Sequence, residues 1–368
     1  MTRPFAPALA MLALALAIPC AHSQPAGALG EDFIHVVQAG DTLSTLAQRY
    51  TGDASNWQPL QTHNGVADPT RLPVAMELHI PLALIPEQAA SARVVHVQGR
   101  AEVDGRLAQP DMAVAEGMRL RTYTDSFLSL ELADGSTVTI PAGSDVSVER
   151  LRQFRAVPLT DSVLHIRAGT VDARVAPAGQ GVGRFEIRAP VAVTGVRGTR
   201  LRVRTQSDGV TSQVMEGHLR VQPHAPGALA DQPVVVASGY GAVVRGDGSL
   251  AGVRPLLPAP RLDTPRRSGG TWHVAFAPVA GAAAYELDIS TDPQALRVVS
   301  SRRIEGPQQA GFAAPGAGRY YVTVRAVDDQ GLTGHHATRP FTGTLALMSS
   351  DGQPVAAGYG ATIMLTLY

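Results

Sequence analysis

The sequence predicts a mainly β, multi-domain protein, and three observations support this fold class. The chain has 368 residues, which is too long for one small domain and fits two or three. From residue 93 to residue 221, short runs of alternating apolar and polar residues recur between glycine turns. Helical spacing is confined to one small unit near the N-terminus. Apolar residues make up 45% of the chain, which is ample for packed cores.

Residues 1–23 have the features of a secretory signal peptide. Arg3 precedes a short apolar run, and small residues at positions −3 and −1 allow cleavage after Ser23. The run is shorter than the roughly 20 residues that span a bilayer, so no transmembrane segment is expected after cleavage. A lipoprotein interpretation would lipidate Cys20, but Pro19 directly before it fits that signal poorly. We therefore expect a periplasmic or secreted protein.

The residue pattern over 34–81 predicts a compact unit with the order β-α-α-β. A strand leads through a glycine turn into a helix that Asp41 or Thr42 can cap by accepting a hydrogen bond from an exposed N–H. The inner face of that helix carries apolar residues at helical spacing, namely Leu43, Leu46, Ala47 and Tyr50. A second short helix over 57–62 and a closing strand over 78–81 complete the unit.

This unit resembles a LysM domain. The matching residues are Val37, Gly40-Asp41-Thr42-Leu43, Ala47, Asn64, Leu78 and Ile80-Pro81. The resemblance implies binding of N-acetylglucosamine glycans, chiefly peptidoglycan, in a shallow groove between the loops 40–43 and 68–72. The candidate glycan-binding residues are therefore Gly40, Asp41, Thr42, Leu43, Thr70, Arg71 and Leu72. Val74-Ala75-Met76 stands where the family usually has Pro-Gly-Gln, at one side of the groove.

The glycan is neutral, so the resemblance implies backbone hydrogen bonds to its acetamido group and apolar contact from Leu43 and Leu72. Residues 34–81 carry four acidic and two basic residues, and peptidoglycan with free stem carboxylates is also anionic. Long-range attraction therefore cannot drive the encounter, and we expect salt to leave binding unchanged or slightly improved.

The stretch Phe185–Val203 is the predicted centre of an all-β domain over residues 92–244. Apolar residues alternate with polar ones at both its ends, where the apolar positions are Phe185, Ile187, Leu201 and Val203. Gly195 and Gly198 are predicted to bracket a tight turn that needs positive φ or close backbone approach. Nothing in this stretch is typical of a catalytic site.

This domain resembles the FecR family of bacterial periplasmic proteins. The matching segments are Ala189–Val203, Asp134-Gly135-Ser136, Arg167-Ala168-Gly169-Thr170, Met215-Glu216-Gly217 and Ala237-Ser238-Gly239-Tyr240-Gly241. Its structural motif residues here are Gly195, Arg197, Gly198 and Thr199. Some members of that family transmit a transport signal through the inner membrane to a σ factor, and others are free periplasmic modules.

Four arginines in this domain form a charged row, and two interpretations of it stay open. The row is Arg197, Arg200, Arg202 and Arg204. It could dock an anionic partner, such as a stem-peptide carboxylate or a lipid phosphate. It could instead be the wet face of a half-buried strand, paired to Glu186 or Asp172. We favour the second interpretation.

Residues 258–345 predict a C-terminal β-sandwich. Apolar residues alternate in several runs there. The stretches 277–287 and 320–328 resemble strands of a fibronectin type III domain. The tail over 346–368 is expected to add one or two terminal strands.

Two stretches rich in proline and alanine are predicted to connect these units. The first is 82–91, and the second is 223–258, which holds one strand-like run at 234–237. Both have few periodic apolar residues and are expected to open easily.

The sequence holds no motif for catalysis or metal binding. A His-Glu-x-x-His helix and a Gly-x-Ser-x-Gly elbow are both missing, and cleavage after Ser23 would leave no cysteine. The adjacent pair His335-His336 is predicted to lie in a solvated loop. With 31 basic and 31 acidic residues, no basic field favours nucleic acid. We expect a protein that is not an enzyme, without metal or cofactor and without a nucleic-acid partner.

These observations favour a non-catalytic envelope protein that binds peptidoglycan through its LysM unit and is associated with the cell wall. The FecR-type domain and the sandwich would then present surfaces to an envelope protein that the sequence does not identify. A periplasmic component of a FecR-like signalling or sensing system is the first alternative. An accessory of a cell-wall hydrolase is the second.

Overall fold

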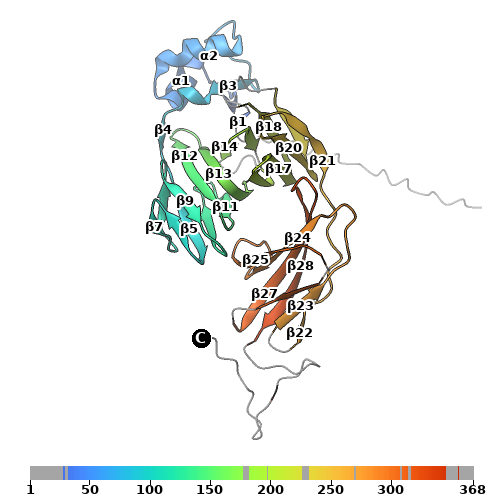
Figure 1. Cartoon of the computed structure of the whole chain (residues 1–368). Helices are drawn as coiled ribbons and strands as arrows, with labels where there is room; N and C mark the ends of the chain where they lie inside the picture. The colour runs from blue at the N-terminus through green and yellow to red at the C-terminus, as the bar shows by residue number, and fades with distance from the viewer. Residues whose placement is uncertain are drawn as a thin grey trace, which may run out of the picture.

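The computed structural model describes residues 28–29, 32–176, 182–196, 198–225, 232–268, 271–306, 309–313, 316–344 and 355. Figure 1 shows a small helical unit at one end, a large β body, and a β-sandwich at the other end. The predicted mainly β, multi-domain fold class is confirmed. The predicted signal peptide and the predicted terminal strands lie outside the described residues, apart from Val355.

The N-terminal unit has the predicted order of elements, with one added strand. Its elements are β1 (Ala28–Leu29), β2 (Asp32–Val36), α1 (Leu43–Thr51), the 3₁₀ helix η1 (Ala54–Asn56), α2 (Trp57–Asn64) and β3 (Glu77–Pro81). β2 pairs antiparallel with both β1 and β3 in a three-stranded sheet. Helix α2 ends at Asn64, with Gly65 in the left-handed conformation that closes a helix.

Helix α1 begins where the sequence predicts, and Thr42 rather than Asp41 is its N-cap. The Thr42 hydroxyl accepts from the N–H of Thr45, while the Thr45 hydroxyl accepts from the N–H of Thr42. Together they satisfy two donors that the first turn would leave free. Gly52 ends the helix at φ 75°. The predicted inner face of α1 is buried along its length.

The stretch 82–91 is not a free linker, contrary to the sequence-based expectation. It contains the 3₁₀ helix η2 (Leu82–Leu84), the strand β4 (Glu87–Ala89) and the start of β5 (Ser91–Gln98). Leu82 and Ile85 are buried in the core of the N-terminal unit, where they join three residues of the β body: Phe154, Val157 and Leu159. The two units therefore share a core.

Within the described residues, the β body is one continuous sheet of 18 strands. After β4 and β5 it comprises β6 (Ala101–Val103), β7 (Arg106–Leu107), β8 (Ala113–Ala115), β9 (Arg119–Thr122), β10 (Phe127–Glu131), β11 (Thr137–Ile140), β12 (Asp145–Phe154), β13 (Thr160–Arg174), β14 (Val182–Ala189), β15 (Ala192–Val196), β16 (Arg200–Gln206), β17 (Gly209–Glu216), β18 (His218–Pro223), β19 (Val234–Ala237), β20 (Tyr240–Arg245) and β21 (Leu250–Pro255). The 15-residue strand β13 organises this body. Its first half pairs with β12 and, in parallel, with β14, and its second half pairs antiparallel with β11 and β16.

The predicted centre of the body is buried as expected, but its turn lies elsewhere. The four alternating apolar residues at the ends of the stretch 185–203 all belong to the main core. Gly195 lies inside β15, opposite Glu186 and Arg220, and not in a turn. Gly198 does take a positive φ of 55°, in the connection from β15 to β16. The chain reverses earlier, at Pro190 and Val191, so β15 is an extra strand that the alternation alone did not separate from β14.

The second predicted connection is also structured for most of its length. Strand β20 pairs with β17, and β21 pairs with β20, so the sheet continues to Pro255. Alternation is weak in β21 because it is an edge strand with mostly half-buried or exposed residues.

The C-terminal part is a sandwich of two sheets around one core. Its strands are β22 (Arg266–Ser268), β23 (Thr271–Ala275), β24 (Ala284–Ser290), β25 (Val298–Ile304), β26 (Gln309–Phe312), β27 (Gly318–Val327) and β28 (Thr333–Gly343). The orders are β22-β23-β26 in one sheet and β25-β24-β27-β28 in the other. Phe341 lies at the centre of an aromatic group with Trp272, Phe312 and Tyr320. The predicted sandwich is confirmed, but His335 and His336 lie within β28 and not in a loop.

Candidate functional site

The first candidate loop is held by a buried polar chain. The Asp41 carboxylate accepts from the Gln38 N–H at 2.8 Å and lies 2.8 Å from Nε2 of His35. Nδ1 of His35 in turn lies 2.8 Å from the Tyr50 hydroxyl. Burial alone would raise the pKa of Asp41, but the hydrogen bonds from Gln38 and His35 hold it below its ordinary value. An ionised Asp41 therefore closes the turn at Gly40, which has φ 93°.

The second loop closes on its own aspartate and touches the first. Asp68 accepts from the N–H of Thr70 at 2.9 Å and from its hydroxyl at 2.7 Å. The Leu43 N–H donates to the Pro69 carbonyl at 3.3 Å, which joins the two loops directly. Thr70 and Arg71 are exposed. The predicted residues of both loops are thus brought together.

The side chain of Leu43 is not available to a ligand, which corrects one sequence-based expectation. It is 0% exposed and lies in the core of the unit, because the first turn of α1 directs it inward. Leu72 is half-buried. The exposed apolar residue that the motif comparison missed is Val74, which is 66% exposed and follows the second loop. The available sequence signal was the departure from the LysM pattern at Val74-Ala75-Met76, at one side of the groove.

Ala75 keeps the backbone conformation of the glycine that the LysM pattern usually has there. Its φ is 69°, which costs an L residue about 1–2 kcal/mol. Its N–H donates to the Val37 carbonyl at 2.9 Å, so the conformation is held by the sheet.

We expect Ala75→Gly to stabilise the chain by roughly 0.5–1 kcal/mol, because the relieved strain exceeds the added chain entropy. Denaturant unfolding of the full chain measures it. Ala113→Gly, at an exposed position in β8, is the matched control and should destabilise by about the same amount. Equal destabilisation by both changes would contradict the strain at Ala75.

The described residues of the FecR motif pack against other parts of the β body. Thr199 is buried, and Gly217 at φ 82° packs over it. A Cβ on Gly217 would lie 2.8 Å from the Gly198 carbonyl, so these two segments of the motif need glycine to approach each other. Arg197 lies outside the described residues.

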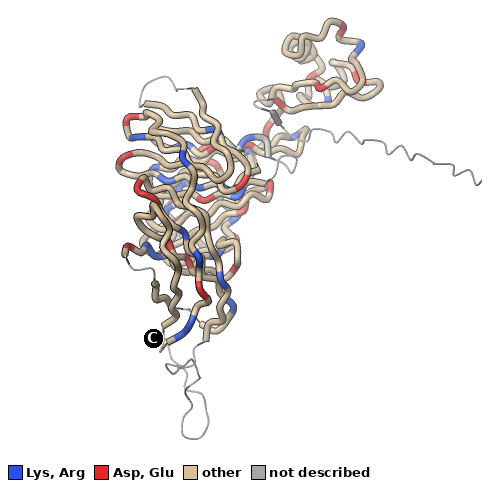
Figure 2. The backbone as a smooth tube through the Cα atoms, turned by 90° about the vertical axis from the view of Figure 1, so that its right-hand side faces the viewer, with Lys and Arg blue, Asp and Glu red and all other residues tan. Residues whose placement is uncertain are grey.

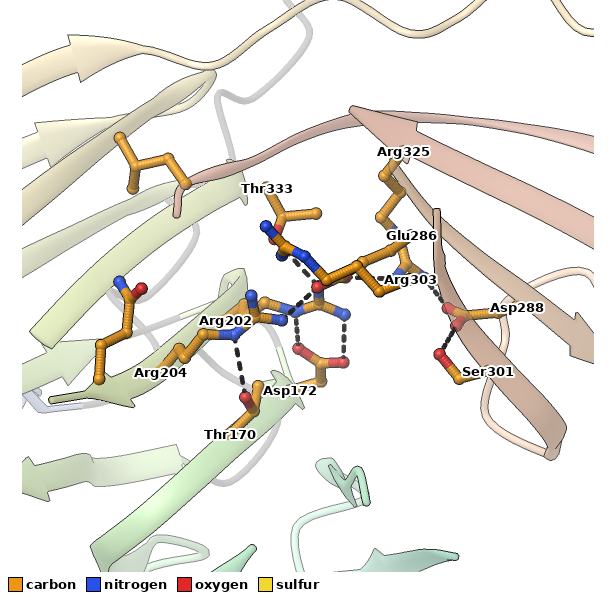
Figure 3. Close-up of polar contacts among 12 residues, drawn as sticks. Thr170, Asp172, Arg202, Arg204, Glu286, Asp288, Ser301, Arg303, Arg325 and Thr333 are labelled. Carbon is orange, nitrogen blue, oxygen red and sulfur yellow. Dashed lines mark hydrogen bonds and ion pairs between the residues drawn. The ribbon is translucent and has the colours of Figure 1, made fainter. Parts of the chain in front are cut away.

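The arginine row docks the chain's own sandwich, which neither sequence interpretation foresaw in full. Arg202 is 7% exposed, pairs with Asp172 through Nη2 at 2.7 Å as predicted, and also pairs with Glu286 of β24 at 2.6 Å. Arg204 pairs with the other oxygen of Glu286 and donates to Thr170. Figure 3 shows these side chains converging between the strands of the body and those of the sandwich.

Two carboxylates of this junction, Glu286 and Asp172, have pKa values below their ordinary values. Burial opposes the charge of Glu286, but Arg202, Arg204 and Arg325 together hold its pKa far below the ordinary value. Asp172 has a lowered pKa because its pairing with Arg202 outweighs burial. Arg325 also pairs with Asp288 at 2.7 Å.

Uncharged contacts extend the junction around this network. The Thr333 N–H donates to the Gln213 side chain at 2.6 Å, and the Ser129 hydroxyl donates to the Leu296 carbonyl at 2.7 Å. Leu332 is buried with Val243 and Leu256. The sandwich is therefore docked on the β body by a contact that combines ion pairs, hydrogen bonds and an apolar cluster.

Comparisons with known proteins agree with this architecture. A model of the LysM domain matches residues 35–81, and a model of the FecR protein family matches residues 118–220. The chain therefore carries a LysM domain followed by a FecR domain, both of the extracytoplasmic type. Within the described residues, no helix is long and apolar enough to cross a membrane.

Similar individual proteins match only loosely. The esterases MT1326 and Rv1288 of Mycobacterium tuberculosis are each 27% identical over 150 residues, which is 40% of this chain and 32% of theirs. This chain thus spans about a third of their length. A Parabacteroides distasonis structure described as an anti-sigma factor has 16% identity and a TM-score of 0.29, covering 37% of this chain and 59% of that one. Chicken CNTN1 FN1–FN3 domains have 10% identity and a TM-score of 0.21, covering 71% and 90%.

The junction and the LysM loops are far apart in the molecule. The LysM domain lies at one end and the sandwich at the other, and Figure 2 shows acidic and basic residues interspersed without one continuous field of either sign. Among the described residues, no group of three or more His, Cys, Asp or Glu side chains is arranged to hold a metal ion.

Proposed function

We propose that this protein is a non-catalytic component of the cell envelope that binds peptidoglycan through its LysM domain. The observation that carries the proposal is the hydrogen bond between Leu43 and Pro69, which joins the two loops of the expected groove. The exposed Thr70 and Arg71 flank that joint. The backbone groups of 40–43 and 68–72 would bind the acetamido group, and Leu72 and Val74 would supply the apolar contact in place of Leu43.

The FecR domain and the sandwich would act as one docked unit that presents a surface to another envelope protein. The junction supports this, because relative motion of the two would separate the buried ion pair of Arg202 and Glu286. In this proposal the LysM domain holds the unit at the wall, in the periplasm or outside the cell.

Binding to purified sacculi by the full chain tests the glycan site. We expect Val74→Asp to weaken retention about tenfold, because a charge replaces an apolar contact worth roughly 1–2 kcal/mol. Val235→Asp is the matched control, since Val235 is a 62% exposed valine on β19. Leu72→Asp should act in the same direction, with unfolding measured in parallel because Leu72 is half-buried.

The salt dependence of the same assay separates this site from an electrostatic one. Retention should be equal in low and high salt, because the LysM domain is not basic and its ligand is neutral. Retention that collapses in high salt, or is unaffected by both LysM changes, would place the anchor elsewhere. Zymography on the sacculi tests the non-catalytic part, and a cleared band would refute it.

The FecR domain supports a second candidate function, that of a periplasmic component of a sensing system. A strain lacking the protein should then lose a transcriptional response to an envelope signal. Unchanged transcripts in that strain would contradict sensing and leave the wall-binding proposal standing.

A further inference from the structure

A pocket lies at the junction between the β body and the sandwich, apart from the LysM loops. Its cavity volume is about 50 Å³, and it opens to solvent on one side. The end of β13 and the start of β16 form one wall, and the loop 294–296 with β27 and β28 forms the other. Its polar lining includes Arg174, Arg200, Arg325 and His336.

The side chains around this pocket carry more positive than negative charge. The carboxylates at the junction are those of Asp172, Glu286 and Asp288, and each pairs with Arg202, Arg204 or Arg325. Arg174 and Arg200 make no ion pair with any residue that the structure describes within 4.0 Å. Glu216 lies across from Arg200 in the strand register, but it is exposed.

Of these two arginines, Arg200 is the one whose guanidinium is half-buried without an ion-pair partner among the described residues. The one hydrogen bond that its side chain makes to a residue the structure describes is a long one, 3.4 Å from Nη2 to the Gln294 carbonyl. Burial and the nearby Arg325 lower the pKa of Arg200, although Asp172 and Glu216 oppose that shift. A half-buried guanidinium that has no ion-pair partner within 4.0 Å is unfavourable, and a bound anion would relieve it.

We propose that this pocket binds a small molecule or chain end with a single carboxylate, held by the Arg200 guanidinium. Arg174 lies at the exposed edge of the pocket and would add to the attraction. The half-buried Leu296 and Met215 would contact the apolar part of the ligand. A monoanion matches the surplus better than a phosphate dianion, because Glu216 offsets part of the positive charge, and the planar guanidinium fits a carboxylate in a paired geometry.

Calorimetric titration of the full chain tests this with acetate, N-acetylalanine and N-acetylalanine amide. Acetate represents a free short acid and N-acetylalanine represents the carboxyl end of a peptide, so their relative affinity identifies the source. We expect at least one acid to bind and the amide not to bind. Arg200→Gln should weaken binding at least tenfold, and Arg174→Gln should weaken it less. The control is Arg220→Gln, at an exposed arginine on β18, which pairs with β15 and β19 and does not line the pocket; it should change nothing.

The titration of His336 gives a second readout that does not depend on the stability of the variants. Burial, Arg200, Arg325 and His335 lower the pKa of His336 to about 4. A carboxylate beside it should raise that pKa, as followed by NMR of the imidazole. If neither acid binds, if the amide binds equally, or if Arg200→Gln leaves affinity and the His336 titration unchanged, the proposal is wrong.

Discussion

Replacement of Glu286 by glutamine is expected to cost about 3–5 kcal/mol and to release the sandwich from the β body. This is the range measured when one partner of a buried ion pair is removed. The Glu286 carboxylate contacts Arg202 and Arg204 and lies 3.8 Å from Arg325. The glutamine would leave these guanidinium groups buried with only Asp172 and Asp288 as counter-charges. Loss of the Glu286 carboxylate is therefore more destabilising than the loss of one partner of a solvent-exposed ion pair.

Thermal unfolding together with small-angle X-ray scattering measures this effect. We expect the sandwich to unfold in a separate transition and the radius of gyration to increase. Glu305→Gln is the matched control, because Glu305 lies in the same sandwich, is 73% exposed and pairs with Arg303. A compact variant with one unchanged transition would show that the apolar and hydrogen-bond contacts alone hold the junction.

The same junction predicts weakening in acid. The folded pKa of Glu286 is depressed, so its contribution is complete above the unfolded value of about 4.3 and is lost as pH falls below it. His336 adds to the loss earlier, because its pKa of about 4 lies below the unfolded value of roughly 6.5. Stability of the docked form should therefore fall from about pH 6.5 downward, and a flat profile to pH 4 would contradict it.

Substitution of Gly169 by alanine is expected to destabilise the β body by about 2–5 kcal/mol. Gly169 lies in the middle of β13 with φ 87°, and a Cβ there would lie 2.6 Å from the Cα of Ser144. The left-handed conformation costs an L residue about 1–2 kcal/mol, and overpacking against backbone adds roughly 1–3 kcal/mol. The backbone cannot move away freely, because the Thr170 N–H donates to the Ser144 hydroxyl at 3.0 Å.

Gly143 provides a control that separates the two causes. Its φ is 69°, but a Cβ there would meet nothing within 4 Å. Gly143→Ala should therefore show the conformational cost alone, about 1–2 kcal/mol. Denaturant unfolding of both variants gives the difference. Equal losses would mean that the contact with Ser144 has no energetic weight.

Local chemistry explains why much of the fold could be predicted. The helix start at Asp41 or Thr42 and the buried alternation around Phe185 and Val203 depend on residues only a few positions apart. Those interactions act within one turn or one strand, so they can be recognised from the sequence alone. Local sequence motifs also identified the two LysM loops, but they did not show that helix α1 buries the side chain of Leu43.

The sequence by itself determined the class of the protein: a LysM unit, a FecR-type β domain and a sandwich, with no catalytic motif. Only the tertiary structure decided that the arginine row contacts the sandwich. Arg202 contacts Glu286, which lies 84 positions further along the chain, and the loop that closes the pocket contacts Arg200 through Gln294, 94 positions further along. Leu82 and Ile85 likewise find Phe154 from another unit. Such pairings arise from packing whole sheets against each other, so alternation in one strand cannot specify the partner of its polar face.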